Sequence, residues 1–133
     1  MRTLLILQDP LERDRLAIGL ANIPDASVEV ASGPTAVERA RRKRFDVVFI
    51  GHDPQDEVNG NGIEITARLR EFDRESEVII VTDARHVRTV KAERERLNIA
   101  SILRTPIDPN DFFRLAARIR TRRPASPGRS VKA

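Results

Sequence analysis

The sequence predicts a single α/β domain in which helices cover both faces of a five-stranded parallel sheet. Short runs rich in Val, Ile and Leu alternate with longer helical patterns along the chain. Three of these runs are continuously apolar, which is typical of strands buried on both faces. A chain of 133 residues with 40% hydrophobic residues has enough apolar surface for one core and too little length for two.

The elements follow one another as strand and then helix. The first helical pattern begins at Pro10, behind Asp9, whose side chain can cap the free N–H groups of the first turn, and it ends before Pro24. Strands are predicted at 3–7, 27–30, 47–50, 78–81 and 99–103, and helices at 10–23, 32–44, from 62, at 86–97 and from 109. Right-handed crossovers between such units predict a doubly wound (βα)5 flavodoxin-like sandwich of strand order 2-1-3-4-5.

In this architecture ligands bind beyond the carboxyl ends of the strands. The segments to consider are therefore 7–10, 51–62, 82–85 and 104–106.

Composition excludes several classes of protein. The chain has no cysteine, so disulfides and thiolate metal sites are excluded. The apolar run at 4–7 is far shorter than a signal-peptide core or a membrane span. We therefore expect a cytoplasmic protein without membrane contact. A domain of residues 1–123 is predicted, and residues 124–133, with their prolines, glycine and serines, are predicted to be a disordered basic tail or the start of a linker.

Positive charge is concentrated near the end of the chain. The net charge is +4, and the segment 112–133 contains Arg and Lys but no acid. Such a segment can attract nucleic-acid phosphates. The same pattern is also that of a solvated Arg-rich helix followed by a tail. Because the sequence shows neither a second folded domain nor a set of stacking aromatics, nucleic acid is not the expected partner.

Five segments carry a resemblance to a known family. These are the opening residues MRTLLILQDP, the segments 31–36, 62–65 and 78–82, and the segment 105–109. Over residues 1 to about 120 the chain resembles response-regulator receiver domains. The resemblance implies the flavodoxin-like fold and a signalling role in a two-component or related phosphorelay pathway, exerted on a signalling protein partner or in a homodimer.

The reactive groups of that family are largely replaced. Receiver domains hold magnesium with two acids after the first strand and phosphorylate an aspartate after the third. They also use a Ser or Thr after the fourth strand and a Lys before the proline of the fifth. The corresponding residues here are Leu7 and Gln8 with the neighbouring Asp9, then Gly51, Thr82 and Thr105.

Leucine and glycine offer neither the carboxylate oxygens that magnesium prefers nor a nucleophile for phosphate. The resemblance therefore implies a degenerate pocket without metal, cofactor or enzymatic activity.

Two alternatives stay open at this stage. The loop after the third strand is about three residues longer than the family pattern and contains Asp53, which could act as a displaced phosphoacceptor in an active receiver. The loop is also rich in turn residues, which is equally typical of a solvated connection with no role in phosphorylation. The second alternative is a regulator that contacts nucleic acid through its basic C-terminal end.

A docking surface is implied by the resemblance alone. In receiver domains the fourth helix, fifth strand and fifth helix form the working face. Candidate contact residues on this face are Val90, Arg94, Ile102, Arg114 and Arg118. Ile102 stands at the place of the family's switch aromatic.

Overall fold

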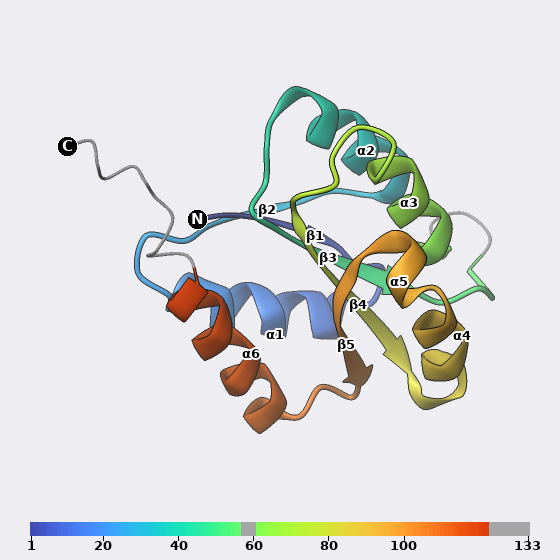
Figure 1. Cartoon of the computed structure of the whole chain (residues 1–133). Helices are drawn as coiled ribbons and strands as arrows, with labels where there is room; N and C mark the ends of the chain where they lie inside the picture. The colour runs from blue at the N-terminus through green and yellow to red at the C-terminus, as the bar shows by residue number, and fades with distance from the viewer. Residues whose placement is uncertain (57–60, 123–133) are drawn as a thin grey trace.

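The structure, a computed structural model, describes residues 1–56 and 61–122. Its five strands form one parallel sheet of order β2-β1-β3-β4-β5, as predicted (Figure 1). The strands are β1 (Arg2–Ile6), β2 (Ser27–Val30), β3 (Val47–His52), β4 (Glu77–Asp83) and β5 (Ile99–Thr105). The predicted tail at 124–133 lies outside the described residues.

Helices connect every pair of consecutive strands. They are α1 (Pro10–Ala21), α2 (Gly33–Arg42), α3 (Gly62–Leu69), the 3₁₀ turn η1 (Ala84–His86), α4 (Val87–Ala92), α5 (Arg94–Leu97) and α6 (Pro109–Arg122). In the part of the chain that the structure describes, no helix combines the length and the apolar character needed to cross a membrane.

The helix predicted over 86–97 is wrong as a continuous element. Glu93 leaves helical geometry, with φ −99° and ψ 2°, and separates α4 from α5. The guanidinium of Arg94 donates to the carbonyls of Ile99 and Ala100, and Asn98 ends α5 in the left-handed conformation with φ 54°. These contacts hold the short α5 against the start of β5, and a straight helix would not make them.

Alternating side chains of the strands build two cores. Leu5, Phe49 and Ile79 point to the face covered by α1 and α6, whereas Leu4 and Ile80 point to the face covered by α2 to α5 (Figure 1). Successive residues of a strand face opposite sides of the sheet, so continuous apolar runs supply both cores at once. The sheet is therefore buried on both faces, and its strand ends are the positions left for a site.

Two caps fix the helices that border the candidate site. The Asp9 carboxylate accepts from the Leu11 N–H at 3.0 Å at the start of α1, as predicted. The Asn61 side chain accepts from the Glu64 N–H at 3.0 Å at the start of α3. Each bond satisfies a backbone donor that has no partner inside its helix.

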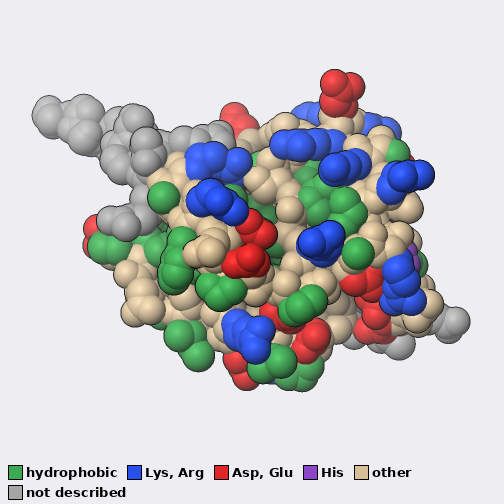
Figure 2. Space-filling view, turned by 90° about the horizontal axis from the view of Figure 1, so that it is seen from below, with side chains coloured by type: hydrophobic (Ala, Val, Ile, Leu, Met, Phe, Trp, Pro, Cys, Tyr) green, Lys and Arg blue, Asp and Glu red, His purple; other side chains and the backbone are tan. Residues whose placement is uncertain are grey.

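Charge is spread unevenly over the surface. In the view from below, Lys and Arg side chains gather in the upper right, with hydrophobic side chains between them (Figure 2). Such a mixed basic and apolar surface is suited to contact with another molecule.

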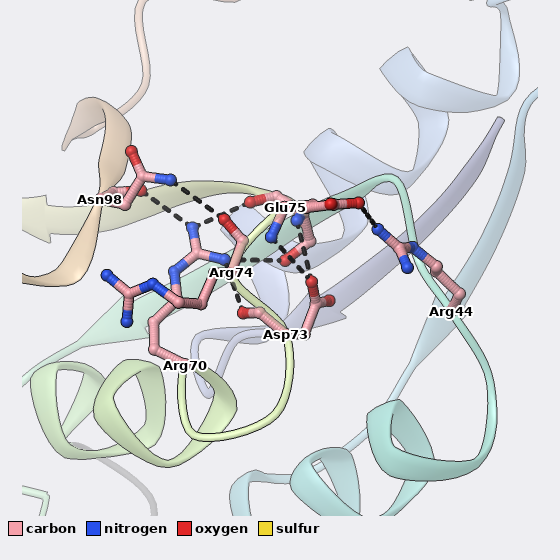
Figure 3. Close-up of polar contacts among 7 residues, drawn as sticks. Arg44, Arg70, Asp73, Arg74, Glu75 and Asn98 are labelled. Atoms are coloured by element: carbon pink, nitrogen blue, oxygen red, sulfur yellow. Dashed lines mark hydrogen bonds and ion pairs between the residues drawn. The ribbon is translucent and has the colours of Figure 1, made fainter. Parts of the chain in front are cut away.

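A buried arginine ties three segments together (Figure 3). Arg70, only 4% exposed, lies at the end of α3. It donates to the carbonyls of Leu97 at 2.8 Å, Asp73 at 2.9 Å and Asn98 at 2.9 Å, and to both the carbonyl and the hydroxyl of Ser76 at 2.8 and 3.2 Å. The sequence pattern does not indicate this burial, because an arginine near a helix end is normally solvated.

Candidate functional site

The carboxyl ends of β1, β3, β4 and β5 enclose a pocket of about 210 Å³. Four of its lining residues, Glu12, His52, Val81 and Asp83, were not predicted as site residues. The structure brings together all seven predicted pocket residues: Leu7, Gln8, Asp9, Gly51, Asp53, Thr82 and Thr105. The register of the parallel strands places them at one edge of the sheet, although they span nearly a hundred positions in the sequence.

The space beside Gly51 is already filled. A side-chain carbon at this position would lie 2.8 Å from Gln8 Oε1, 3.0 Å from Leu7 Cδ2 and 3.4 Å from the Ile6 carbonyl. Two of these contacts are closer than side chains normally tolerate. The side-chain ends of Gln8 and Leu7 thus lie where a side chain at position 51 would begin.

The hydroxyl of Thr82 is used inside the sheet. Thr82 is 2% exposed, and its Oγ1 donates to the carbonyl of His52 at 2.7 Å. The two residues are paired across β3 and β4. A hydroxyl held in this way supports the sheet and does not point freely at a ligand.

His52 is the last residue of β3 and is buried, with 6% exposure. Its Nδ1 accepts from the Gly62 N–H at 3.0 Å, so the neutral ring carries its proton on Nε2. A side chain at Gly62 would lie 2.6 Å from the Gly51 carbonyl, which explains why glycine stands there. The predicted strand stops at residue 50, two residues short of the end of β3, so the sequence pattern does not indicate that His52 anchors α3.

Burial lowers the pKa of His52, and the nearby His86 lowers it further, against the raising effect of Asp53 and Asp83. The two imidazole rings meet edge to face, with centroids 6.0 Å apart. His86 Nδ1 lies 2.8 Å from Asp83 Oδ1. The ring of His52 is therefore held neutral by its surroundings.

Three acids around the pocket each make a contact of their own. Asp9 caps α1, Asp53 accepts from the Gln55 N–H at 3.1 Å within its own turn, and Asp83 pairs with Arg85 at 2.9 Å. In residues 1–56 and 61–122, no three His, Cys, Asp or Glu side chains lie close enough together to hold a metal ion.

Glu12 is the exception among these acids because it is 5% exposed, and its Oε1 has no hydrogen-bond partner among the described residues. One buried carboxylate of this kind does not make a metal site without further ligands.

The predicted docking residues differ in exposure and in the contacts that they already make within the domain. Val90 is wrong as a surface candidate: it is fully buried, because α4 turns it toward the sheet. Arg94 bonds the carbonyls at the start of β5. Arg114 pairs with Asp111 at 2.6 Å.

Arg118 pairs with Glu77 at 3.1 Å and also donates to Ser101 at 2.9 Å. Ile102 is half-buried against the core. The three predicted arginines are thus exposed but already engaged within the domain.

Two grooves flank β5, the last strand of the sheet. The groove toward α4 has a volume of about 500 Å³ and is lined by Ala84, Val87, Arg88, Lys91, Ile102 and Arg104. The groove toward α6, of about 410 Å³, is lined by Ser101, Ile102, Leu103, Asp111, Arg114, Leu115 and Arg118. Ile102 lies at the border of both.

No family model and no curated protein matches the chain, whereas solved structures match it closely in shape. An adenylate cyclase from Rhodopirellula baltica superposes with a TM-score of 0.76 at 19% identity, covering 89% of this chain and 85% of that one. A LuxR-family two-component response regulator from Aurantimonas sp. SI85-9A1 has a TM-score of 0.72 at 20% identity, covering 92% and 86%.

A third match is the receiver domain of a sensor histidine kinase from Pseudomonas aeruginosa PAO1, with magnesium in its active-site cleft. Its TM-score is 0.70 at 20% identity, covering 88% of this chain and 94% of that one. The chain has the receiver fold. At these identities the likeness concerns the fold, and the chemistry of a receiver-fold protein depends on its own site residues.

Proposed function

We propose that this chain is a receiver-fold signalling module that acts by docking to a partner protein, without phosphorylation of an aspartate. The observation that carries the proposal is the environment of Gly51. The position has no side chain, and Gln8 and Leu7 fill the space that a side chain would need.

The other parts of a phosphoryl-transfer site are also missing or engaged. Phosphoryl transfer depends on a metal ion and on cations that neutralise charge on the transferred group. Leu7 and Gln8 carry no charge, Thr105 stands where the resemblance places the lysine, and the Thr82 hydroxyl is bonded to His52. The pocket therefore supports the fold, and signalling is assigned to the outer surface.

The displaced-acceptor alternative depends on Asp53. This residue lines the pocket and is exposed, but its carboxylate is held by the Gln55 N–H in a turn. Among the described residues Asp53 makes no ion pair, and Arg85, which interacts with it electrostatically, is paired with Asp83, so an incoming phosphate would meet little unpaired positive charge there.

The test is incubation of the full chain with acetyl phosphate and magnesium, followed by intact-mass measurement. We expect no change in mass for the wild type or for Asp53→Asn. A labile adduct of one phosphoryl group on the wild type that Asp53→Asn lacks would contradict the proposal and establish the displaced acceptor. An adduct on both proteins would contradict it by placing the acceptor elsewhere.

A further inference from the structure

We propose that the pocket at the strand ends binds an alkylammonium group, whose charged end meets the buried carboxylate of Glu12. Small amines and the lysine side chain of a protein share this group. The inference goes beyond the proposed function, because docking on the outer surface does not require it. It is carried by a buried carboxylate without a partner in the described part of the chain, by the negative lining of the pocket and by its apolar wall.

Glu12 is a buried acid on the inner face of α1, the face that also carries Leu16 and Leu20. It lines the pocket and is 5% exposed, and its Oε1 has no hydrogen-bond partner among the described residues. A carboxylate withdrawn from water is costly unless a hydrogen-bond donor or a cation meets it. The ligand best suited to this position is therefore a cation that carries N–H donors.

The other polar side chains of the pocket do not neutralise this acid. Asp9, Asp53 and Asp83 line the pocket as well, and each already makes a contact of its own. The lowered pKa of His52 leaves that ring neutral. No Arg or Lys belongs to the lining in residues 1–56 and 61–122, since Arg85 pairs with Asp83 from an exposed position outside it. A pocket lined in this way attracts positive charge.

The size of the pocket and the arrangement of its acids favour a small organic cation over a metal ion. Its volume of about 210 Å³ lies below the roughly 300–1,000 Å³ of pockets for drug-sized ligands, so the ligand has few atoms. Magnesium and calcium need several oxygen ligands, and no three acid or histidine side chains of the described residues lie close enough to supply them. An ammonium group needs only acceptors for its three N–H donors.

The apolar wall of the pocket suits the alkyl part of such a ligand. Leu7 and Val81 line the pocket and are buried. Gly51 lies between them, paired with Val81 across the sheet and in contact range of Leu7, and it adds backbone without a side chain. Contact with this wall removes methylene groups of an amine from water, whereas a hydrated metal ion gains nothing from it.

The probe is n-butylammonium, titrated into the nitrogen-15-labelled full chain at neutral pH and constant ionic strength, with n-butanol as the neutral isostere. An alkylamine is protonated at this pH. We expect the amine to shift the amide signals of residues 9–12, 51–53 and 82–83 in a saturable manner, with a dissociation constant in the millimolar range because so few atoms bind. The alcohol should bind at least about fivefold more weakly, because it lacks the charge.

Glu12→Gln removes the charge and keeps the shape of the side chain. We expect this variant to bind the amine about tenfold more weakly or worse, and to fold as well as the wild type, because a neutral amide replaces a buried charge. Asp14→Asn is the matched control, since it removes the same charge from an exposed position of the same helix. It should bind within about twofold of the wild type.

Thr105→Lys provides a second variant that retains Glu12. Position 105 lines the same pocket, so the new side chain brings an ammonium group into it from within the chain. We expect this variant to lose binding of n-butylammonium.

Blocked lysine, N-acetyl-lysine methylamide, separates the two sources of the ammonium group. Binding as tight as that of n-butylammonium assigns the site to the lysine side chain of a protein. Binding of the free amine alone assigns it to a small molecule.

Absence of saturable binding would overturn the inference, and so would equal binding of n-butanol or equal binding of the amine to the Glu12→Gln protein. A rise in melting temperature that magnesium or calcium produces, that Glu12→Gln abolishes and that the amine does not reproduce would assign the pocket to a metal ion. None of these results alters the acetyl phosphate assay, so the inference and the proposed function fail separately.

Discussion

At position 51 the backbone of β3 runs so close to Gln8 and Leu7 that a side chain has almost no room. Each of the two opposing atoms is the end of a side chain that can turn, whereas the Ile6 carbonyl is fixed by the sheet. The residue types at 7, 8 and 51 therefore form one packing unit. These three residues lie together at the position where the receiver resemblance places the phosphoacceptor.

Gly51→Asp is expected to destabilise the domain by about 1–3 kcal/mol, because the new side chain displaces neighbours in a packed site. It should create no phosphorylation with acetyl phosphate. Urea denaturation measures the loss. In a Gln8→Ala background the same substitution should be less costly, since the nearest opposing atom is gone. A Gly51→Asp protein that is as stable as the wild type and readily phosphorylated would show that the pocket is intact.

His52 gives the domain a dependence on pH. Its pKa is lowered in the folded state, first by burial and then by His86. Below the ordinary histidine pKa of about 6.5, the unfolded chain takes up a proton that the folded chain resists. The stability that the neutral ring contributes is thus complete above that pH and is lost as the pH falls through the lowered pKa.

We expect His52→Gln to reduce this loss of stability on acidification, because glutamine can still accept from the Gly62 N–H but does not titrate. The measurement is the free energy of unfolding of both proteins from neutral to mildly acidic pH. Parallel curves for the two proteins would show that another group controls the response.

At the scale of the elements, Arg70 joins the end of α3, the loop before β4 and the turn from α5 into β5 (Figure 3). Asn98 adds to the junction by donating from its side chain to the Arg74 carbonyl at 3.2 Å. The junction fixes where β5 begins, and hence the position of the groove beside it.

Arg70→Met is expected to cost about 3 kcal/mol or more, because it leaves several buried acceptors without donors. Arg70→Lys should also be clearly destabilising, since an ammonium group cannot reproduce the planar set of donors. The free energy of unfolding and the hydrogen exchange of the amides at 97–100 report the effect. Arg68→Lys is the control, as this exposed residue of the same helix makes, among the described residues, a single long pair with Glu64 at 3.5 Å. Equal losses for the two lysine variants would exclude a special role for Arg70.

For the molecule as a whole, the pocket at the strand ends and the grooves beside β5 are separate. The pocket lies beyond the carboxyl edge of the central strands, while the groove lies beside β5 at the end of the sheet. If the chain signals by docking as proposed, partner binding beside β5 requires no phosphorylation in the pocket.

Magnesium at millimolar concentration is expected to leave the melting temperature unchanged, because a ligand stabilises a protein only by binding its folded state. Asp9 is engaged as a helix cap and Asp83 in an ion pair. Glu12 contributes one oxygen without a partner among the described residues. Thermal denaturation against magnesium concentration is the measurement. A saturable rise that Glu12→Gln or Asp9→Asn abolishes would reveal a metal site built from these acids.

The sequence alone determined the architecture. Continuous apolar runs separated by helical patterns predicted the sheet, and their order predicted β2-β1-β3-β4-β5. These features follow from local periodicity and from the rules of chain connection, which a sequence displays directly. The receiver resemblance, and not periodicity, selected the seven residues that line the pocket.

Only the tertiary structure decided which side chains are free to act. It buried Val90, engaged Arg94 and Arg114 inside the domain, and left Arg88 and Arg104 unpaired within the described residues. The polar residues His52 and Arg70 are also buried in the structure, and each holds neighbouring segments together through hydrogen bonds. Burial and pairing depend on atoms contributed by elements distant along the chain, so a local sequence pattern does not predict them.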